Sequence, residues 1–289
     1  MDEWSLEGKN TEIDEENGSI FSSRPRSGFI VSIIVLVLMI LVSAGGLVIE
    51  NIYQDIEVIQ EGWLGNALIS LFIAVPLLAG SMIFSWRGSE RAKLLWMGML
   101  YFTLCNYTFY LFGAAFNYLF PFYVGIVILS ALGLMLSFKS IDEKKVSRLL
   151  RHNLPIKWMG VFIAGVVIVL LVFSSWIYLE FFFTGALPGI VLGTPDMTKM
   201  VSTVNLLFII PLGFASAFWI WDRNPWGHVL SIVWNVNLMV YTAALSSSTL
   251  FAFKTGELGN LNELGLWMSI AIACLIVVVI LLDRMGGKS

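Results

Sequence analysis

The sequence predicts an all-α membrane protein with eight transmembrane helices, arranged as two parallel four-helix repeats. Three observations lead to this fold class. Of the 289 residues, 58% are apolar and only 13% are charged, which leaves too few polar residues to cover a water-exposed surface. Apolar segments long enough to cross a bilayer recur along the whole chain, and two of them share an internal sequence match.

The eight spans follow from the length of these apolar segments. A helix needs about 20 predominantly apolar residues to cross the hydrocarbon core of a membrane. Segments of this kind lie at 28–49, 64–86, 94–116, 119–138, 157–180, 203–221, 226–247 and 264–282. Only Asn117 and Tyr118 separate the third segment from the fourth, which predicts a tight turn between them.

The basic residues predict the orientation, because Lys and Arg collect in cytoplasmic loops. With the N-terminus in the cytoplasm, eight spans place 15 of the 17 Lys and Arg residues on the cytoplasmic side. Only Lys199 and Lys254 fall outside. An odd number of spans would put the later basic clusters on the wrong side. We therefore expect a multi-pass protein of the cytoplasmic membrane with both termini in the cytoplasm.

Composition divides the chain into four parts. Residues 1–27 form an acidic tail, whose polar composition predicts disorder in the cytoplasm. The first four-helix half covers 28–138, and the second covers 157–289. The linker between them, 139–156, is basic and is typical of a short helix lying on anionic lipid.

An internal duplication is indicated by the second and sixth spans. Pro76 lies ten residues before Trp86, and Pro211 lies ten residues before Trp221, with an apolar run before each proline. Because four spans is an even number, both halves would start on the same side of the membrane. The predicted pseudo-twofold axis then runs along the membrane normal.

Polar residues within the spans mark the candidate site, because each needs a partner at membrane depth. In the third span the polar face carries Asn106, Tyr110 and Asn117, and the seventh span repeats the spacing with Asn235, Thr242 and Ser246. One interpretation is a polar cavity between the two halves that holds a small ligand. The other is helix packing through ordinary interhelical hydrogen bonds.

Two acidic residues are candidates for ion or proton coupling. Glu50 and Glu180 stand at equivalent positions near the outer ends of the first and fifth spans. A carboxylate at this depth can reach water, so neither residue has to be buried or neutral.

Motifs for catalysis are missing from the sequence. The chain has two histidines, both at cytoplasmic ends, and no HExxH, GxSxG, P-loop or dinucleotide fingerprint in a loop. Cys105 and Cys274 lie within predicted spans, where cysteine usually behaves as a small apolar residue. The sequence therefore indicates no catalytic residue, no metal site and no cofactor.

One resemblance covers about two-thirds of the chain. The runs NYTFYLFGAAFN, at Asn106 to Asn117, and WDRNPWG, at Trp221 to Gly227, resemble recurring segments of a group of bacterial and archaeal multi-pass membrane proteins. That group has no assigned activity. The resemblance implies the multi-pass topology and the polar face of the third span, and it implies no function.

Three functions remain open at this point. The first is binding or transport of a small neutral or lipophilic solute between the halves, in which the bilayer and the solute are the partners. The second is a regulatory or assembly subunit that contacts another membrane protein. The third is an enzyme that modifies a lipid. Nothing in the sequence indicates binding to nucleic acid.

Overall fold

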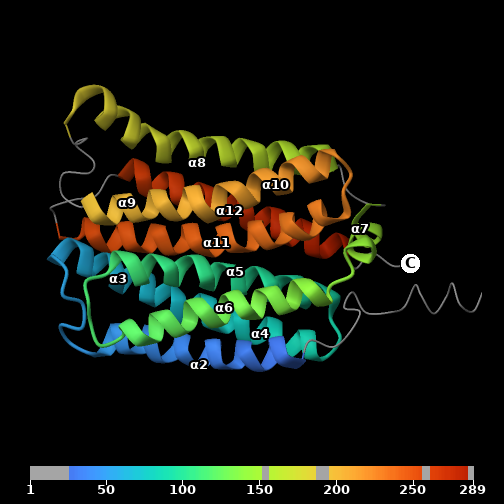
Figure 1. Ribbon diagram of the computed structural model, residues 1–289, viewed down its shortest axis with the longest axis horizontal. Coiled ribbons are helices and arrows are strands. Elements are labelled where there is room, and N and C mark those ends of the chain that lie inside the picture. The colour runs from blue at the N-terminus through green and yellow to red at the C-terminus, as the bar shows by residue number, and fades with distance from the viewer. Residues whose placement is uncertain (1–25, 152–155, 187–194, 256–260, 286–289) are drawn as a thin grey trace, which may run out of the picture.

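The computed structural model describes residues 26–151, 156–186, 195–255 and 261–285, and every statement of structure below concerns these residues. Within them the chain is helical and contains no β-strand. Figure 1 shows the long helices lying side by side, with their axes close to one common direction. The predicted all-α class is therefore confirmed. The predicted acidic tail lies outside the described residues, apart from its last two positions.

The helices fall into two groups that are joined by a short linker helix. We call α2 to α6 the first half and α8 to α12 the second half. The first half consists of α2 (Arg26–Val48), α3 (Glu57–Ile69), the π-helical segment η1 (Ser70–Ala74), α4 (Val75–Trp86), α5 (Glu90–Gly113) and α6 (Phe120–Ser140). The second half consists of α8 (Ile156–Thr184), α9 (Pro195–Val204), the π-helical segment η2 (Asn205–Ile209), α10 (Ile210–Trp221), α11 (Pro225–Phe253) and α12 (Leu261–Arg284). The linker helix is α7 (Glu143–Arg151).

Seven helices in the described part of the chain are long and apolar enough to cross a membrane. They correspond to seven of the eight predicted spans, and they support a polytopic membrane protein. The remaining predicted span, the third one at 94–116, largely coincides with α5, which has 24 residues but is not among the seven. Neighbouring helices bury most side chains of α5, so its surface does not need to be apolar. A membrane crossing by α5 stays a prediction.

Several structural landmarks recur at one spacing in the two halves. The pairs 135 positions apart are the π-segment starts Ser70 and Asn205, the prolines Pro76 and Pro211, the helix ends Trp86 and Trp221, and the helix starts Glu90 and Pro225. Proline has no N–H group, and a π-helical turn is one way in which a membrane helix adjusts its hydrogen bonds around it. The predicted duplication and its symmetry axis both stay predictions.

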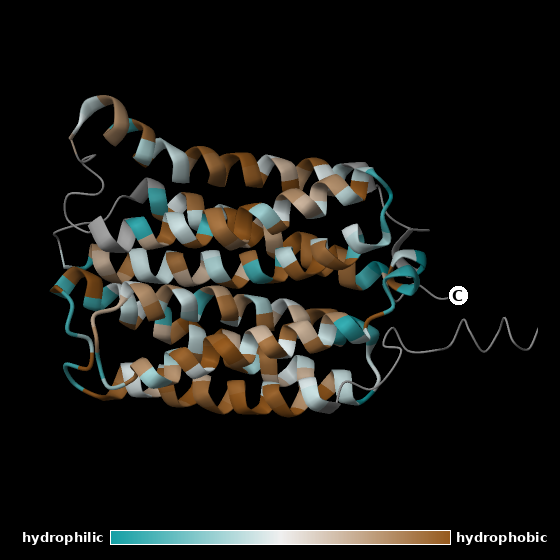
Figure 2. Ribbon diagram, in the orientation of Figure 1, coloured by the Kyte–Doolittle hydropathy of each residue, from teal (hydrophilic) through white to brown (hydrophobic). Residues whose placement is uncertain are grey.

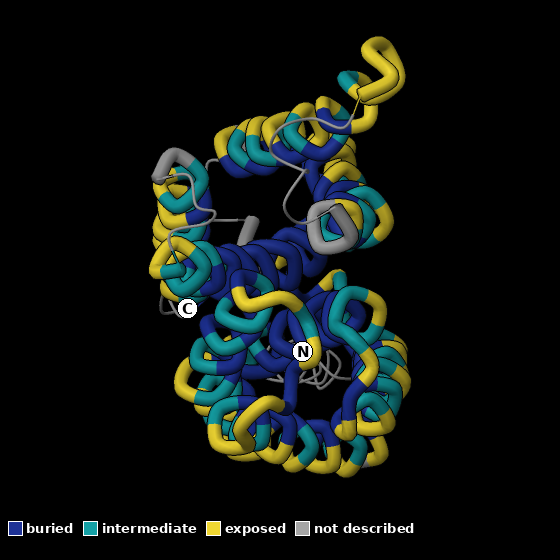
Figure 3. Tube along the Cα trace, turned by 90° about the vertical axis from the view of Figure 1, so that its left-hand side faces the viewer, coloured by how far each residue is buried: buried dark blue, intermediate teal, exposed yellow. Residues whose placement is uncertain are grey.

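The helices α5 and α11 lie at the centre of the molecule and pack against each other. Figure 3, which looks along the helices, shows buried residues where the two halves meet and exposed residues around the outside. In the most apolar window of α11, 94% of the residues are buried, against 28% for the outer helix α12. Figure 2 shows that outer helices such as α2 are largely hydrophobic. The polar residues of α5 and α11 therefore face protein and not lipid.

The two halves differ in how their helices close around the interior. In the first half, α2 packs along α6 and completes a ring. In the second half, α8 packs along α10 but makes no extended contact with α12 among the described residues. We call this interrupted contact the α8/α12 seam.

A second difference concerns the helix that reaches across to the other half. The helix α3 packs closely on α11, whereas α9 makes a much smaller contact with α5. Gly65 permits the first approach, because a Cβ atom at this position would lie 2.6 Å from the Ser247 carbonyl oxygen. The residue 135 positions later, in α9, is Met200, a larger residue that is partly buried against the core.

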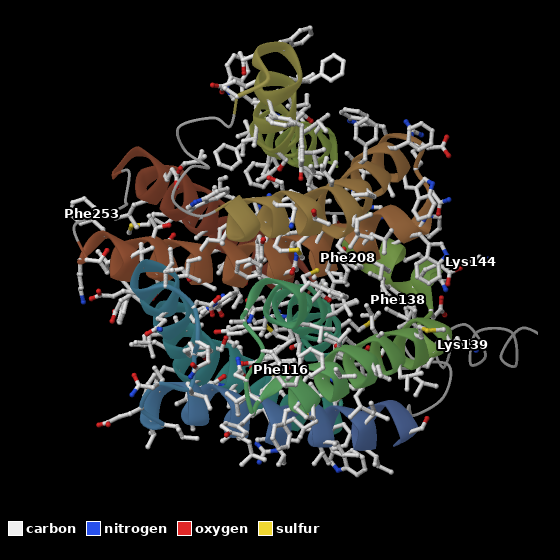
Figure 4. All side chains as sticks on the ribbon, turned by 60° about the vertical axis from the view of Figure 1, so that its left-hand side comes forward. Phe116, Phe138, Lys139, Lys144, Phe208 and Phe253 are labelled. Carbon is white, nitrogen blue, oxygen red and sulfur yellow. The ribbon has the colours of Figure 1, made fainter. Side chains whose placement is uncertain are left out.

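The linker helix α7 marks one end of the molecule, which we call the α7 end. It packs on α11 and α12 with Val146 buried, while Lys144 and Arg148 are exposed. Figure 4 labels Lys139 and Lys144 at this end. The opposite end, where segments 49–56 and 114–119 connect helices of the first half, is called the loop end.

Candidate functional site

A closed hydrogen-bond network joins α3 and α5 inside the first half. The Asn66 amide donates to Asn106 Oδ1 at 3.0 Å, and the Asn106 amide donates to Asn66 Oδ1 at 3.1 Å. The Asn106 amide also donates to Ser70 Oγ at 3.3 Å, and the Ser70 hydroxyl donates to Asn66 Oδ1 at 3.2 Å. All three side chains are at most 1% exposed. The network therefore satisfies its own buried polar groups.

An aromatic cluster lies beside this network, toward the loop end. The Tyr110 ring lies 4.6 Å from the Trp63 ring, and the Tyr110 hydroxyl donates to the Trp63 carbonyl oxygen at 3.1 Å. The other members are Tyr53, Tyr107, Phe109 and Tyr123. The hydroxyls of Tyr53 and Tyr123 are buried and form no well-aligned hydrogen bond. The Tyr53 hydroxyl lies near that of Tyr110, and the Tyr123 hydroxyl lies near that of Tyr53.

Half-buried Asp55 fastens the loop end to this cluster. Its carboxylate accepts hydrogen bonds from Trp63 Nε1 at 3.0 Å and from the Ala115 N–H at 3.1 and 3.2 Å. Burial raises the pKa of the Asp55 carboxyl above its usual value, and these hydrogen bonds oppose that shift. Asn117 shapes the next turn, since its amide donates to the Ala115 carbonyl oxygen and its Oδ1 accepts from the Leu119 N–H, both at 2.9 Å.

In the second half, two side chains hold the π-helical segment η2. The Trp234 indole N–H of α11 donates to the Ile209 carbonyl oxygen at 2.8 Å. The Tyr101 hydroxyl of α5 donates to the Phe208 carbonyl oxygen at 2.8 Å. Figure 4 labels Phe208 between the two halves. A π-helical turn shifts the regular ladder of carbonyl acceptors, and here neighbouring helices supply donors to it.

Two stripes of mostly polar side chains, one on α11 and one on α9 and η2, run from the hydrogen bond between Trp234 and Ile209 toward the loop end. On α11, Trp234, Asn237 and Tyr241 are spaced by three and four residues and share one face. That face is turned into the second half, because Gly213 of α10 leaves room for the Trp234 ring beside Val167 of α8. On α9 and η2, positions 202, 205 and 209 have the same spacing. The hydrogen bond from Trp234 to Ile209 joins the two stripes at one end, and from there α9 and α11 run in opposite directions without an extended backbone contact among the described residues.

Five polar side-chain atoms on these stripes have no hydrogen-bond partner. They are the Ser202 hydroxyl, Asn205 Oδ1, both amide atoms of Asn237 and the Tyr241 hydroxyl. All four side chains are at most 1% exposed. The Asn205 amide nitrogen has a partner, since it donates to Ser174 Oγ of α8 at 3.3 Å. We call Ser202, Asn205, Asn237 and Tyr241 the second polar centre. Each unpartnered buried group costs about 1–3 kcal/mol, so four side chains of this kind in the second half require an explanation.

The structure brings the predicted polar residues of the third span into the first half and not toward the seventh span. Asn106 and Tyr110 contact α3, and Asn117 belongs to the loop end. On α11, Thr242 and Ser246 donate to carbonyl oxygens of their own helix, each at 2.7 Å. The Asn235 amide donates to the Ser231 carbonyl oxygen, while its Oδ1 is unpartnered. A cavity between the halves stays a prediction.

The two predicted coupling residues lie at the loop end. Glu50 is exposed just after α2, and Glu180 is partly exposed in the last turns of α8. Neither forms an ion pair within the described residues. Their role in ion or proton coupling stays a prediction.

Four residues of the second polar centre were missed by the sequence analysis. The spacing of four, three and four residues in the two spans led to Asn235, which lies 129 positions after Asn106. An alignment of the halves at the two prolines would instead have paired Asn106 with Tyr241 and Ser70 with Asn205, each 135 positions apart. The alignment at the prolines could therefore have identified Asn205 and Tyr241 from the sequence.

Comparison with known proteins leaves the chain without a relative from which a function could be taken. No protein-family model, no curated protein and no solved structure matches it. Among the described residues, no group of three or more His, Cys, Asp and Glu side chains is placed to hold a metal ion. Its function must therefore be argued from the polar centres of a multi-pass membrane protein.

Proposed function

We propose that this membrane protein binds a small neutral or lipophilic solute at the second polar centre, and that transport of the solute starts from this bound state. The observation that carries the proposal is Asn237, which is fully buried and has no partner for either its amide nitrogen or its carbonyl oxygen. A bound molecule would supply both partners at once. Asn205 Oδ1 and the Tyr241 hydroxyl are also buried without partners, and a bound molecule would supply hydrogen bonds to them as well.

The chemistry of the centre favours an uncharged solute. Its side chains are amides and hydroxyls, which offer donors and acceptors without net charge. Among the second-half side chains whose exposure is described (158–186, 199–255 and 263–285), no Asp, Glu, Lys or Arg is buried. An ion held at this depth would need an opposite charge nearby, so the centre suits a neutral molecule better.

The first half suits a supporting role. Its own polar network is closed, and its helices form a complete ring, so it offers a rigid surface against α11. Tyr101 extends from this half to the η2 segment, which fixes one border of the second polar centre.

Native mass spectrometry of the full-length protein, released gently from its own membrane, would test the proposal. The wild-type spectrum should contain a population with added mass from a bound small molecule. Asn237→Leu should lose that population, because it removes both amide atoms at nearly constant volume. Thr242→Val is the matched control on the same helix, since the Thr242 hydroxyl is already satisfied by the Leu238 carbonyl oxygen. Equal occupancy in wild type and Asn237→Leu would contradict the proposal.

A further inference from the structure

We infer that the ligand of the second polar centre is an uncharged amphiphile that enters from the bilayer through the α8/α12 seam, where the Phe173 and Trp267 rings form the closing contact. This inference rests on the proposed function and adds the chemical class of the ligand and its route. It is carried by the seam, by the side chains on its borders and by the polar groups directly behind it.

The seam is the place where the ring of helices in the second half is incomplete. The equivalent contact in the first half, between α2 and α6, runs along both helices. Across the seam, the Phe173 ring of α8 packs on the Trp267 ring of α12, with the ring centroids 5.4 Å apart and the ring planes nearly perpendicular at 85°. A single aromatic pair is a weaker closure than a contact that runs along two helices, so the seam is where the second half would open first.

The seam leads directly to the second polar centre. Phe173 is followed in α8 by Ser174, which is fully buried and accepts a hydrogen bond from the Asn205 amide. Neighbouring residues of one helix turn thus contact α12 on one side and the polar centre on the other. Displacement of the Phe173 ring would therefore bring a molecule within one helix turn of Asn205.

The two helices of the seam carry exposed apolar side chains, as expected of surfaces that contact lipid. Val172 and Trp176 of α8 are 59% and 62% exposed, and Ile272 and Leu275 of α12 are 54% and 48% exposed. A water-soluble solute would have to cross this surface, whereas a lipid-like molecule is already dissolved beside it. The route therefore selects a ligand with an apolar tail.

The head of the ligand follows from the polar groups that it would meet. Asn237 offers one donor and one acceptor, Asn205 offers an acceptor, and the hydroxyls of Tyr241 and Ser202 can act in either sense. A head with hydroxyl groups matches this set, because each hydroxyl both donates and accepts. Monoacylglycerol, with two free hydroxyls on one acyl chain, is the simplest probe of this class.

Photolabelling in vesicles provides the first test. The full-length protein is reconstituted in phosphatidylcholine vesicles that contain a diazirine-bearing monoacylglycerol, and the labelled peptides are mapped by mass spectrometry. We expect saturable labelling of α8, α9 and α11, reduced at least tenfold by Asn237→Leu and unchanged by Thr242→Val. Unlabelled monoacylglycerol should compete, and glycerol at the same concentration should not. If glycerol competed and unlabelled monoacylglycerol did not, the inference that the ligand is an amphiphile would be wrong. Labelling that Asn237→Leu leaves unchanged, or that is not saturable, would count against the polar centre and so against the proposed function.

Crosslinking of the seam tests the route separately. The variant Phe173→Cys/Trp267→Cys is made with Cys105 and Cys274 replaced by Ala, and a short bifunctional thiol reagent then joins α8 to α12. We expect labelling to fall at least tenfold after crosslinking and to stay at or above the wild-type level before it. The matched control is Leu38→Cys/Gly125→Cys, which joins the closed contact between α2 and α6 and should leave labelling unchanged. Undiminished labelling after seam crosslinking would overturn the route while leaving the proposed function intact.

Discussion

The two central helices place different residues at the same position and reach opposite results. Asn106 and Tyr241 each lie 16 residues after the first residue of their helix, α5 and α11. Asn106 closes a network in which the Asn66, Asn106 and Ser70 side chains satisfy one another. Tyr241 and its neighbours on the second polar centre have no partners. The position 16 residues into the helix thus joins two helices in the first half, and in the second half it carries a hydroxyl without a hydrogen-bond partner.

The packing of the helices is also tighter in the first half than in the second. The first half closes its ring and brings α3 onto α11 through Gly65, while the second half has the α8/α12 seam and a larger residue, Met200, at the position equivalent to Gly65. A half that is tightly packed resists movement, and one that is loosely closed can admit a guest. This difference agrees with the proposed supporting role of the first half and the proposed binding role of the second.

The largest expected effect is that of Asn106→Leu. This change removes the centre of the first network and leaves the Asn66 amide and the Ser70 hydroxyl buried with fewer partners, so the free energy of unfolding should fall by about 2 kcal/mol. Thermal unfolding in detergent, followed by intrinsic fluorescence, measures the effect. Phe102→Leu, a nearby apolar change on the same helix, controls for repacking alone. An Asn106→Leu protein as stable as wild type would remove the distinction between the two halves.

Asn237→Leu should act in the opposite sense on protein without ligand. Because neither amide atom has a partner, their removal relieves a buried polar cost, and the free energy of unfolding should rise by about 1 kcal/mol. The same thermal assay measures this on delipidated protein. A functional site commonly gives up stability in this way. A loss of stability as large as that of Asn106→Leu would mean that Asn237 is a packing residue.

The sequence predicted the helices well because their signals are local. The apolar segment at 226–247 became α11 (Pro225–Phe253), and the proline in each of the second and sixth spans marks a π-helical adjustment. The sequence also identified Asn106 and Tyr110 as residues of the interior. Periodicity gives the face on which a side chain lies, but not the helix opposite it. Whether Asn106 or Asn237 has a partner depends on which helices pack against α5 and α11, and the local sequence does not contain that information.

A smaller effect is expected at the contact between the halves. Tyr101→Phe removes the donor to the Phe208 carbonyl oxygen, which should lower the free energy of unfolding by about 1 kcal/mol. Tyr241→Phe is the matched change, since it removes a hydroxyl without a partner, and it should be neutral or slightly stabilising in protein without ligand. Thermal unfolding of both variants side by side measures the difference. Equal losses from both would contradict the assignment of unpartnered groups to the second half.

The smallest effect concerns Asp55, at the loop end of the first half, and it depends on pH. Burial raises the pKa of the Asp55 carboxyl in the folded protein above that in the unfolded chain. Between those two pKa values the folded state binds more protons, so this group's contribution to stability falls as pH rises through that range and is constant above it. Asp55→Asn cannot ionise, and the difference in melting temperature between wild type and this variant isolates Asp55 from the other carboxyl groups. We expect wild type to lose stability relative to Asp55→Asn from about pH 4 upward, the usual pKa of the side chain. The opposite slope would mean that the hydrogen bonds from Trp63 and Ala115 outweigh burial, and that the loop end is held by a stabilised charge.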